Sequence, residues 1–237
     1  MSRQLSYGEA IREATDQLMA ESDRVYVMGL GVPDPKAVFG TTAGLEEKYG
    51  SKRVFDMPTA ENAMTGVCIG SALLGMRPIM VHQRIDFLLL AFDQIVNNAA
   101  KWYSMFNGQQ NVPLVIRCIV GRGWGQGPQH SQNLQAMFAH VPGLKVVAPA
   151  LPADAKGMLI AAVRDNDPVL FIEHRWLHST FGDVPPEMYE TPLGKAKVVR
   201  GGNDVSIVAT SFMVIEALRA AEALSREGID AEVVDVR

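Results

Sequence analysis

The feature that most constrains the fold is an alternation between short apolar runs and segments with a helical pattern. Runs rich in β-branched residues are expected as strands at 24–30, 53–57, 78–82, 113–120, 145–148 and 168–173. Helices are expected between them at 6–21, 61–74, 86–105, 131–140 and 152–164. Strands this apolar are buried on both faces, which is typical of a parallel sheet covered by helices. The sequence therefore predicts an α/β fold with a helix-flanked parallel sheet.

The composition changes after the last of these strands. Pro185, Pro186 and Pro192 interrupt a polar segment that is typical of a linker. A strand at 204–210, an Ala-rich helix at 214–227 and a strand at 231–236 follow. Two strands and one helix bury too little apolar surface to form a domain alone. We therefore expect a domain at 1–180, a linker at 181–196 and the start of an incomplete second α/β domain at 197–237.

Charge and hydropathy exclude several classes of function. The net charge of −4 over 237 residues provides no basic field for nucleic acid. The apolar stretch at 87–92 is far shorter than the roughly 20 residues that span a membrane. The N-terminal residues 1–17 are polar and amphipathic, unlike a secretory signal. Cys68 and Cys118 lie in apolar surroundings and are expected to be buried free thiols. We expect a cytoplasmic protein.

Three polar or aromatic positions follow expected strands. Glu61 lies on the first turn of an expected helix, where a carboxylate can also serve simply to stabilise the helix N-terminus. Phe87 follows the strand at 78–82, and His130 follows a Gly-rich loop after the strand at 113–120. Individually, Phe87 is also compatible with a core position and His130 with a helix cap. Parallel sheets bind ligands at the carboxyl edge, so their shared location favours a binding site.

Neither Gly-rich segment has the pattern of a nucleotide-binding loop. The segment at 29–33 lacks a third glycine and contains Pro33 where a helix would begin. The segment at 121–127 has no Lys-Ser or Lys-Thr ending. A structural turn is the simpler interpretation of the first segment.

Several motifs occur together in one order along the chain. They are Pro58-x-x-Glu61, Gly70-x-x-x-x-Gly75-x-Arg77-Pro78, Asp86-Phe87, Asp93-Gln94-Ile95-Val96-Asn97, Gln129-His130-Ser131-Gln132, Pro142-Gly143 and Asp154-Ala155-Lys156-Gly157. Over essentially its whole length, the chain resembles the beta subunit of the thiamine-diphosphate-dependent 2-oxoacid dehydrogenases of the pyruvate, branched-chain and acetoin type. The resemblance implies oxidative decarboxylation of a 2-oxoacid with acyl transfer to a lipoyl group.

The resemblance also implies roles for particular residues. Glu61 matches the glutamate that hydrogen-bonds the aminopyrimidine ring of thiamine diphosphate and favours its imino tautomer. Phe87 matches an aromatic residue that packs against this ring, and Thr59 and Gln83 are expected to contact the cofactor. His130 matches the histidine that faces the reacting centre and assists acylation of the lipoyl group, a role suited to imidazole.

Metals and partners are implied in the same way. The family places the diphosphate and Mg²⁺ on an alpha subunit through a Gly-Asp-Gly motif, which this sequence lacks. The chain is thus expected to supply half an active site in an alpha2beta2 assembly with a beta–beta contact and a lipoyl acyltransferase core. A potassium ion is expected on the backbone carbonyls of four residues, Leu114, Ala162, Asp165 and Asp167.

Some positions depart from the family pattern. His82, Gln83 and Arg84 stand where more apolar residues are usual, and Thr59 replaces an aliphatic residue. Arg84 and Gln83 are candidates to bind a substrate carboxylate, or else they form a solvated loop face. The departures leave the substrate open, as well as two alternatives: a two-chain decarboxylase or transketolase-like carboligase without a lipoyl acceptor, and an inert assembly partner. The family's C-terminal domain continues past Arg237, so a truncated or naturally short chain is expected.

Overall fold

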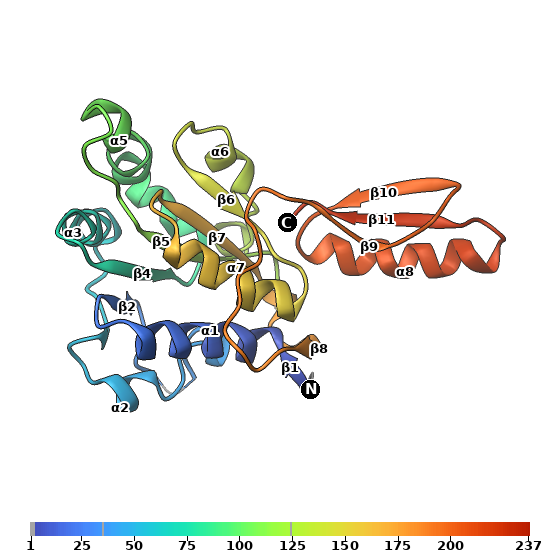
Figure 1. The fold of residues 1–237 in the computed structure, drawn as a ribbon, viewed down its shortest axis with the longest axis horizontal. Coiled ribbons are helices and arrows are strands. Elements are labelled where there is room, and N and C mark those ends of the chain that lie inside the picture. Colours follow the sequence, from blue (N-terminus) through green and yellow to red (C-terminus); the bar gives the residue numbers. More distant parts are fainter. Residues whose placement is uncertain (1–2, 35, 124) are drawn as a thin grey trace.

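A computed structural model describes residues 3–34, 36–123 and 125–237, so Trp124 of the Gly-rich loop lies outside the described residues. A six-stranded parallel sheet with the order β3-β2-β4-β5-β7-β6 forms the centre of the molecule (Figure 1). Its strands are β2 Val25–Gly29, β3 Val54–Phe55, β4 Arg77–His82, β5 Val115–Val120, β6 Lys145–Val147 and β7 Val169–His174. The predicted α/β class is confirmed.

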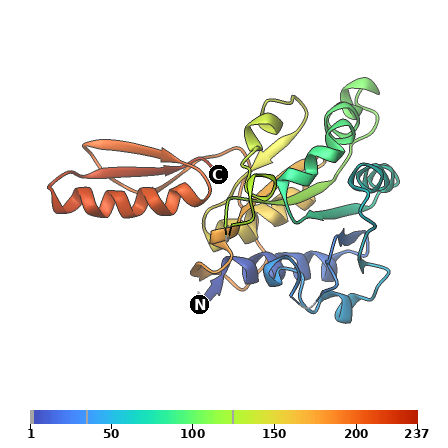
Figure 2. The same ribbon diagram turned by 180° about the vertical axis from the view of Figure 1, so that it is seen from behind.

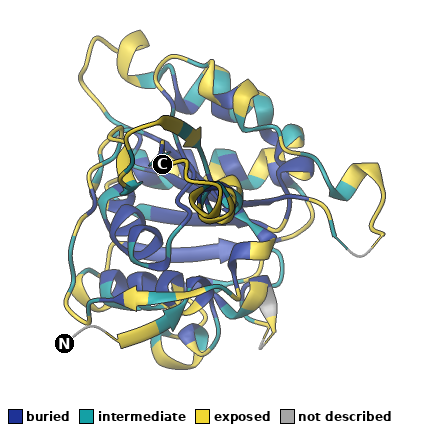
Figure 3. Ribbon diagram, turned by 90° about the vertical axis from the view of Figure 1, so that its right-hand side faces the viewer, coloured by how far each residue is buried: buried dark blue, intermediate teal, exposed yellow. Residues whose placement is uncertain are grey.

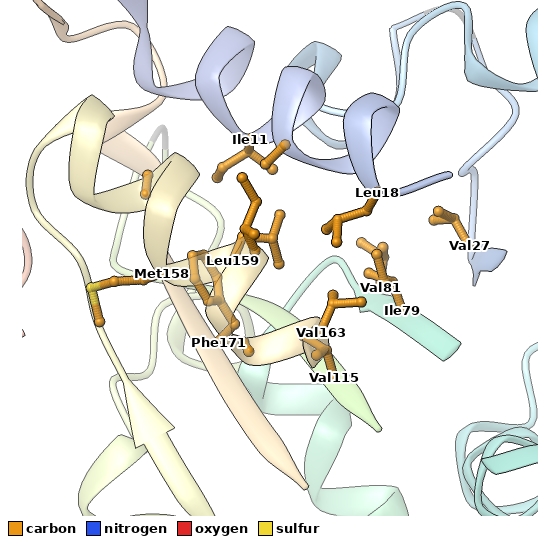
Figure 4. Close-up of a cluster of buried hydrophobic side chains, with 14 of the residues drawn as sticks. Ile11, Leu18, Val27, Ile79, Val81, Val115, Met158, Leu159, Val163 and Phe171 are labelled. Atoms are coloured by element: carbon orange, nitrogen blue, oxygen red, sulfur yellow. The ribbon is translucent and has the colours of Figure 1, made fainter. Parts of the chain in front are cut away.

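Helices cover both faces of this sheet. The helices α1 Tyr7–Glu21 and α7 Pro152–Arg164 pack on one face, where Ile11 and Leu18 meet Ile79 and Val81 of β4 (Figure 4). On the other face, Met80 packs with α3 Glu61–Leu73, with the helical segment that follows β4, and with α6 Gln135–Ala139. Alternate strand residues thus enter two separate cores. Figure 3 shows the buried sheet between partly exposed helices.

The helix expected at 86–105 is wrong as a single element. The chain instead forms α4 Ile85–Leu88, a 3₁₀ turn η2 Leu89–Ala91, a π-helix η3 Gln94–Ala99 and α5 Trp102–Met105. The buried positions 85, 88, 91, 95 and 99 are three or four residues apart, a spacing that one face of an unbroken α-helix would also have. The hydrophobic pattern therefore predicts the buried face but does not reveal the change of helix type.

The helix expected at 131–140 begins later than predicted. A 3₁₀ turn, η4 Pro128–His130, precedes it, and only Gln135–Ala139 is α-helical. Gln132 explains the delay, because both its backbone N–H and its side-chain amide donate to the Asp86 carboxylate. That interaction holds the chain at Gln132 outside a helix.

Several short elements were missed. The strand β1 Arg3–Ser6 pairs antiparallel with β8 Phe181–Val184, so the segment expected as a linker begins with a strand. The other missed elements are α2 Leu45–Tyr49, η1 Ala37–Gly40, η5 Arg175–Leu177 and β9 Lys197–Arg200. Each is five residues or shorter, too short to show a convincing hydrophobic period.

The C-terminal part forms a separate three-stranded sheet that projects from the main one (Figures 1 and 2). Its elements are β9, β10 Val205–Ala209, α8 Phe212–Arg226 and β11 Ala231–Asp235. Arg237 connects the two parts: its guanidinium donates to Asp154 at 3.2 Å, and its carbonyl accepts from the Ala148 N–H at 3.1 Å. The buried Lys156 ammonium donates to the Pro185 and Glu187 carbonyls at 2.7 and 2.8 Å, and so fixes the connecting segment against α7.

The structure also bears on the expected state of the cysteines and on membrane-spanning helices. Cys68 and Cys118 are both buried free thiols, as predicted. Among the described residues, no helix has both the length and the apolar character needed to cross a bilayer.

A buried ion pair joins the neighbouring strands β5 and β7. Arg117 donates to both Glu173 oxygens at 2.6 and 3.0 Å, and to the Thr41 hydroxyl at 2.8 Å. The His178 Nε2 lies 3.0 Å from the same carboxylate. Burial alone raises the pKa of Glu173, yet the Arg117 charge and the His178 hydrogen bond hold it at about 2, below the ordinary 4.5. The native state therefore requires an ionised Glu173.

We predict that Glu173→Gln lowers the free energy of unfolding by about 3 kcal/mol or more, because it leaves a buried guanidinium uncompensated. Urea unfolding followed by circular dichroism measures this change. The matched control is Glu216→Gln, which removes an exposed ion pair with Arg219 and should change stability by less than about 0.5 kcal/mol. Equal effects of the two substitutions would show that the buried pair does not stabilise the sheet.

Candidate active site

A cavity of about 330 Å³ opens at the carboxyl edge of the sheet. It lies where the chain order reverses, since β3 and β4 flank β2 on opposite sides. This is the position at which open parallel sheets bind ligands. Glu61, Phe87 and His130 all line it, so the structure brings these three predicted residues together. The lining is completed by Leu30, Met57, Val81, His82, Gln83, Arg84 and Gln126.

Glu61 is the first residue of α3, and only 4% of it is exposed. The N-cap residue Ala60 offers no capping side chain. Among the described residues, none donates a hydrogen bond to the Glu61 carboxylate or forms an ion pair with it. Glu61 is therefore not held by a hydrogen bond within the described part of the chain, although its place on the first turn of α3 also suits a carboxylate that stabilises the helix N-terminus. A buried carboxylate at the wall of a cavity is available to a ligand.

Phe87 and His130 are held in contact by the segments that carry them. Their rings meet edge to face, with centroids 5.2 Å apart and planes at 77°. The neighbouring Asp86 carboxylate accepts from the Gln132 backbone at 3.3 Å and from its side chain at 2.8 Å. Asp86 and Gln132 thus join the start of α4 to the loop after β5. Because this bond fixes both loops, it also fixes the two aromatic rings.

A glycine is required where that loop begins. Gly121 has φ +94°, which favours glycine, and a Cβ there would lie 2.4 Å from Nε2 of His174. Any side chain would therefore both strain the backbone and collide with β7. The turn at Gly121 directs the chain from β5 toward the cavity.

The other residues predicted to contact the cofactor or the substrate differ in their position relative to the cavity. Arg84 is only 5% exposed and donates to the Gly121 carbonyl at 3.2 Å and to the Gln126 amide oxygen, so it is not part of a solvated loop face. The exposed Gln83 donates to the Leu30 carbonyl at 2.8 Å and lines the cavity. Thr59 is exposed and does not line it.

The residues expected around potassium lie at the opposite edge of the sheet. The Leu114 carbonyl accepts from Val169 at 2.9 Å, and the Asp165 carbonyl accepts from the Arg77 guanidinium at 2.8 Å. The Lys145 ammonium bridges the carboxylates of Asp165 and Asp167 at 2.7 and 3.0 Å. Ala162 is buried within α7.

Two cationic side chains therefore already supply positive charge to this region. Across the described ranges, no group of three or more His, Cys, Asp or Glu residues is arranged to hold a metal ion.

Sequence reasoning assigned no role to three residues near the cavity: His82, Gln126 and Arg175. Arg175 directly follows β7, so the strand-end rule that selected Glu61 also applied to it. His82 is the last residue of β4, and 3% of it is exposed. Its Nε2 has no hydrogen-bond partner among the described residues, and burial lowers its pKa from 6.5 to about 4. His82 therefore contributes a neutral imidazole to the cavity wall.

Comparison with known proteins agrees with this geometry. Residues 3–179 match the family described as the transketolase pyrimidine binding domain, and residues 194–237 match the transketolase C-terminal domain. A solved structure of a split gene transketolase, an inactive beta4 tetramer, superposes with a TM-score of 0.77 at 25% identity, covering 98% of this chain and 71% of that one.

Curated relatives are more similar in sequence. The chain is 48% identical to the acetoin:2,6-dichlorophenolindophenol oxidoreductase subunit beta of Cupriavidus necator, covering 100% of this chain and 73% of the relative. It is 46% identical to the 2-oxoisovalerate dehydrogenase subunit beta of Bacillus subtilis, with coverages of 98% and 72%. Identity to the pyruvate dehydrogenase E1 component subunit beta of Rickettsia felis is 42%, with coverages of 99% and 72%.

The fold and the cavity at its carboxyl edge define a pyrimidine-binding domain of the transketolase type. Within this class, the chain belongs to the family of beta subunits of the thiamine-diphosphate-dependent 2-oxoacid dehydrogenases. The resemblance inferred from its motifs is thereby confirmed.

The buried neutral His82 predicts a pH dependence of stability. Its folded pKa of about 4 lies below the ordinary 6.5, so the unfolded chain binds more protons between these values. Its contribution is complete above pH 6.5 and is lost as the pH falls toward 4. From pH 7.5 to pH 5 the loss is about 2 kcal/mol.

Urea unfolding at both pH values tests this prediction. His82→Gln should shrink the stability difference between pH 7.5 and pH 5 by that amount, whereas His140→Gln, at an exposed position, should leave it unchanged. An undiminished difference in the His82 variant would contradict the prediction.

Proposed function

We propose that the chain acts as the beta subunit of a thiamine-diphosphate-dependent 2-oxoacid dehydrogenase. The reaction is oxidative decarboxylation of a 2-oxoacid with transfer of the acyl group to a lipoyl group. The observation that carries the proposal is the convergence of Glu61, Phe87 and His130 on one cavity at the carboxyl edge. The names of two relatives, a 2-oxoisovalerate dehydrogenase and a pyruvate dehydrogenase, support the same reaction class.

The cavity fits the aminopyrimidine half of thiamine diphosphate. Leu30 and Met57 provide apolar walls, and the partly exposed Phe87 provides an aromatic face. Glu61 provides a carboxylate for the polar edge of the ring. Apolar walls with a few placed polar groups are typical of cofactor sites. When bound, the cofactor would supply a nucleophilic carbon and a thiazolium ring that can serve as electron sink for decarboxylation.

Glu61 would hold the proton at a pyrimidine ring nitrogen. Its carboxylate has no hydrogen bond from the described part of the protein and is buried, so a ring nitrogen would be its partner. A hydrogen bond is stronger in such a low-dielectric environment than in water. Glu61 therefore serves activation of the cofactor rather than folding.

His130 would act on the acyl acceptor. The half-buried imidazole is oriented by its contact with Phe87, and through it by the bond between Asp86 and Gln132. An imidazole can both donate and accept a proton near neutral pH. We assign it to proton transfer and orientation when the lipoyl sulfur is acylated.

Because this chain would supply only the pyrimidine-binding half of the active site, a partner subunit is needed for the other half. An alpha subunit would bring the diphosphate and Mg²⁺, giving an alpha2beta2 assembly with a beta–beta contact and docking to a lipoyl acyltransferase core in the cytoplasm. We retain the division into residues 1–180, 181–196 and 197–237. A potassium ion at the carbonyls of Leu114, Ala162, Asp165 and Asp167 would have to share the Asp165 carbonyl with the Arg77 guanidinium.

A transketolase-like carboligase split over two chains is the second candidate. A split gene transketolase shares its fold, but the higher sequence identity to dehydrogenase beta subunits supports the dehydrogenase. The acceptor distinguishes the two candidates: the dehydrogenase transfers its acyl group to a lipoyl domain, whereas the carboligase forms an acyloin with an aldehyde.

We predict that Glu61→Gln lowers 2-oxoacid decarboxylation about 100-fold or more in an assembly reconstituted with an alpha-type subunit, thiamine diphosphate and Mg²⁺. The thermal unfolding temperature should change little, because the carboxylate has no described protein partner. Glu47→Gln, on the exposed side of α2, is the matched control and should retain full activity. Undiminished turnover in the Glu61 variant would refute the assigned role.

A further inference from the structure

A second cavity of about 370 Å³ adjoins the Glu61 cavity. The two share Gln83, Arg84 and Gln126 as lining residues. The other residues of the second cavity are Asp34, Lys36, Val38, Phe39, Ile119 and Arg175. Most of its lining comes from segments that follow β2, β4, β5 and β7. A ligand that reacts beside Glu61 can therefore extend into this second cavity.

Two buried arginines meet at its wall. Arg84 and Arg175 are each only 5% exposed. Both donate to the same atom, Oε1 of Gln126, and the Arg175 distance is 2.6 Å. Burial lowers the pKa of Arg84, and the neighbouring charge of Arg175 lowers it further; burial also lowers the pKa of Arg175. Positive charge is concentrated here at an energetic cost.

The oxygens that Arg84 contacts are neutral. They belong to the Gly121 carbonyl and to the Gln126 amide. Among the described residues, no carboxylate forms an ion pair with Arg84; the Asp86 carboxylate, which accepts from Gln132 instead, only partly offsets the lowering of the Arg84 pKa by burial and by Arg175. Asp34 lines the same cavity but is exposed, and it accepts from the backbone N–H of Lys36. Because a buried cation is costly without a counter-charge, the arrangement favours an anionic ligand.

The leaving carboxylate of a 2-oxoacid is a poor match for this site. Two guanidinium groups would stabilise that carboxylate before reaction, but its charge moves into the thiazolium as carbon dioxide leaves. An interaction that is stronger in the ground state than in the transition state slows the chemical step. An anionic group that keeps its charge throughout has no such disadvantage, and its binding can orient the reacting end.

We propose that Arg84, Arg175 and Gln126 bind a second, retained anionic group of the substrate, so that the enzyme acts on a 2-oxoacid with a distal carboxylate or phosphate. The identification of the ligand as a 2-oxoacid substrate rests on the proposed function, whereas the anion-binding site itself does not. A guanidinium group can bind either a carboxylate or a phosphate through two parallel hydrogen bonds. The role of Arg84 is thereby moved from the reacting carboxylate to the far end of the substrate.

Substrate selectivity tests the inference in the reconstituted alpha–beta assembly. We compare kcat/KM for 2-oxoglutarate, for a 2-oxoacid carrying a terminal phosphate, and for 2-oxovalerate, whose distal end carries no charge. At least one of the two substrates with a distal anion should be favoured over 2-oxovalerate by about 10- to 100-fold. Arg84→Met and Arg175→Met should each reduce that ratio toward 1, and Arg84→Lys should restore part of it. The control is Arg122→Met, at an exposed position of the Gly-rich loop that also carries Gln126. This substitution should leave the ratio unchanged.

Direct binding separates this inference from the proposed function. The thermal unfolding temperature of the full chain is measured with glutarate, with inorganic phosphate and with uncharged pentanediol. A rise with glutarate alone indicates a distal carboxylate, and a rise with phosphate alone indicates a phosphate. Each rise must disappear in Arg84→Met, with Arg84→Lys as the second variant if the first unfolds.

The failures are distinguishable. Suppose that kcat/KM for 2-oxovalerate equals or exceeds that for both substrates with a distal anion, and that neither glutarate nor phosphate stabilises the chain. The anion site is then refuted, while the proposed function stands. If no 2-oxoacid reacts but an anion stabilises the chain in an Arg84-dependent way, the anion site stands and the proposed function fails.

Discussion

The common direction of the six central strands is the constraint on which the rest of this structure depends. Because all strands of the main sheet run parallel, the segments that follow them emerge at one edge. Glu61 enters after β3, Phe87 after β4, His130 after β5 and Arg175 after β7. Residues more than 100 positions apart in the chain thus reach neighbouring cavities. The buried pair of Arg117 and Glu173 joins β5 to β7 and so supports the same edge.

A small number of polar contacts between the loops then fixes the side chains. The Asp56 carboxylate accepts from the Gly31 backbone at 3.0 Å, which ties the loop after β3 to the loop after β2. Gln83 and Asp86 make similar connections to the loops after β2 and β5. In contrast, the Glu61 carboxylate and the His82 Nε2 have no such partner among the described residues. The positioning groups thus make hydrogen bonds within the chain, although Oδ2 of Asp86 has no partner among the described residues, and the groups at the cavity wall remain available to a ligand.

The strong periodic patterns were sufficient to predict the main sheet and the edge that carries the site. The segment after β4 was mispredicted as one helix because its buried positions are three or four residues apart. That spacing is also α-helical, so the sequence gives no sign of the 3₁₀ and π segments. The late start of α6 has a similar cause, since the bond between Asp86 and Gln132 joins residues 46 positions apart. The short strands β1 and β8 form because they pair with each other, and neither segment alone has a pattern that predicts a strand.

Glu61 and His130 were found from their places after strands and from the family motifs, whereas Gln126 in a Gly-rich loop had no distinguishing pattern. The two arginines meet only because β4 and β7 both flank β5.

In the proposed function this chain supplies a half-site: it would hold the pyrimidine ring, and an alpha-type subunit would hold the diphosphate. The central claim is that the buried Glu61 carboxylate activates the cofactor. The most direct measurement is the rate of hydrogen–deuterium exchange at the thiazolium carbon of thiamine diphosphate bound to the alpha–beta assembly, followed by NMR after acid quench. The account predicts exchange about 100-fold or more slower in Glu61→Gln than in the wild type. Equal exchange rates in the two assemblies would contradict it.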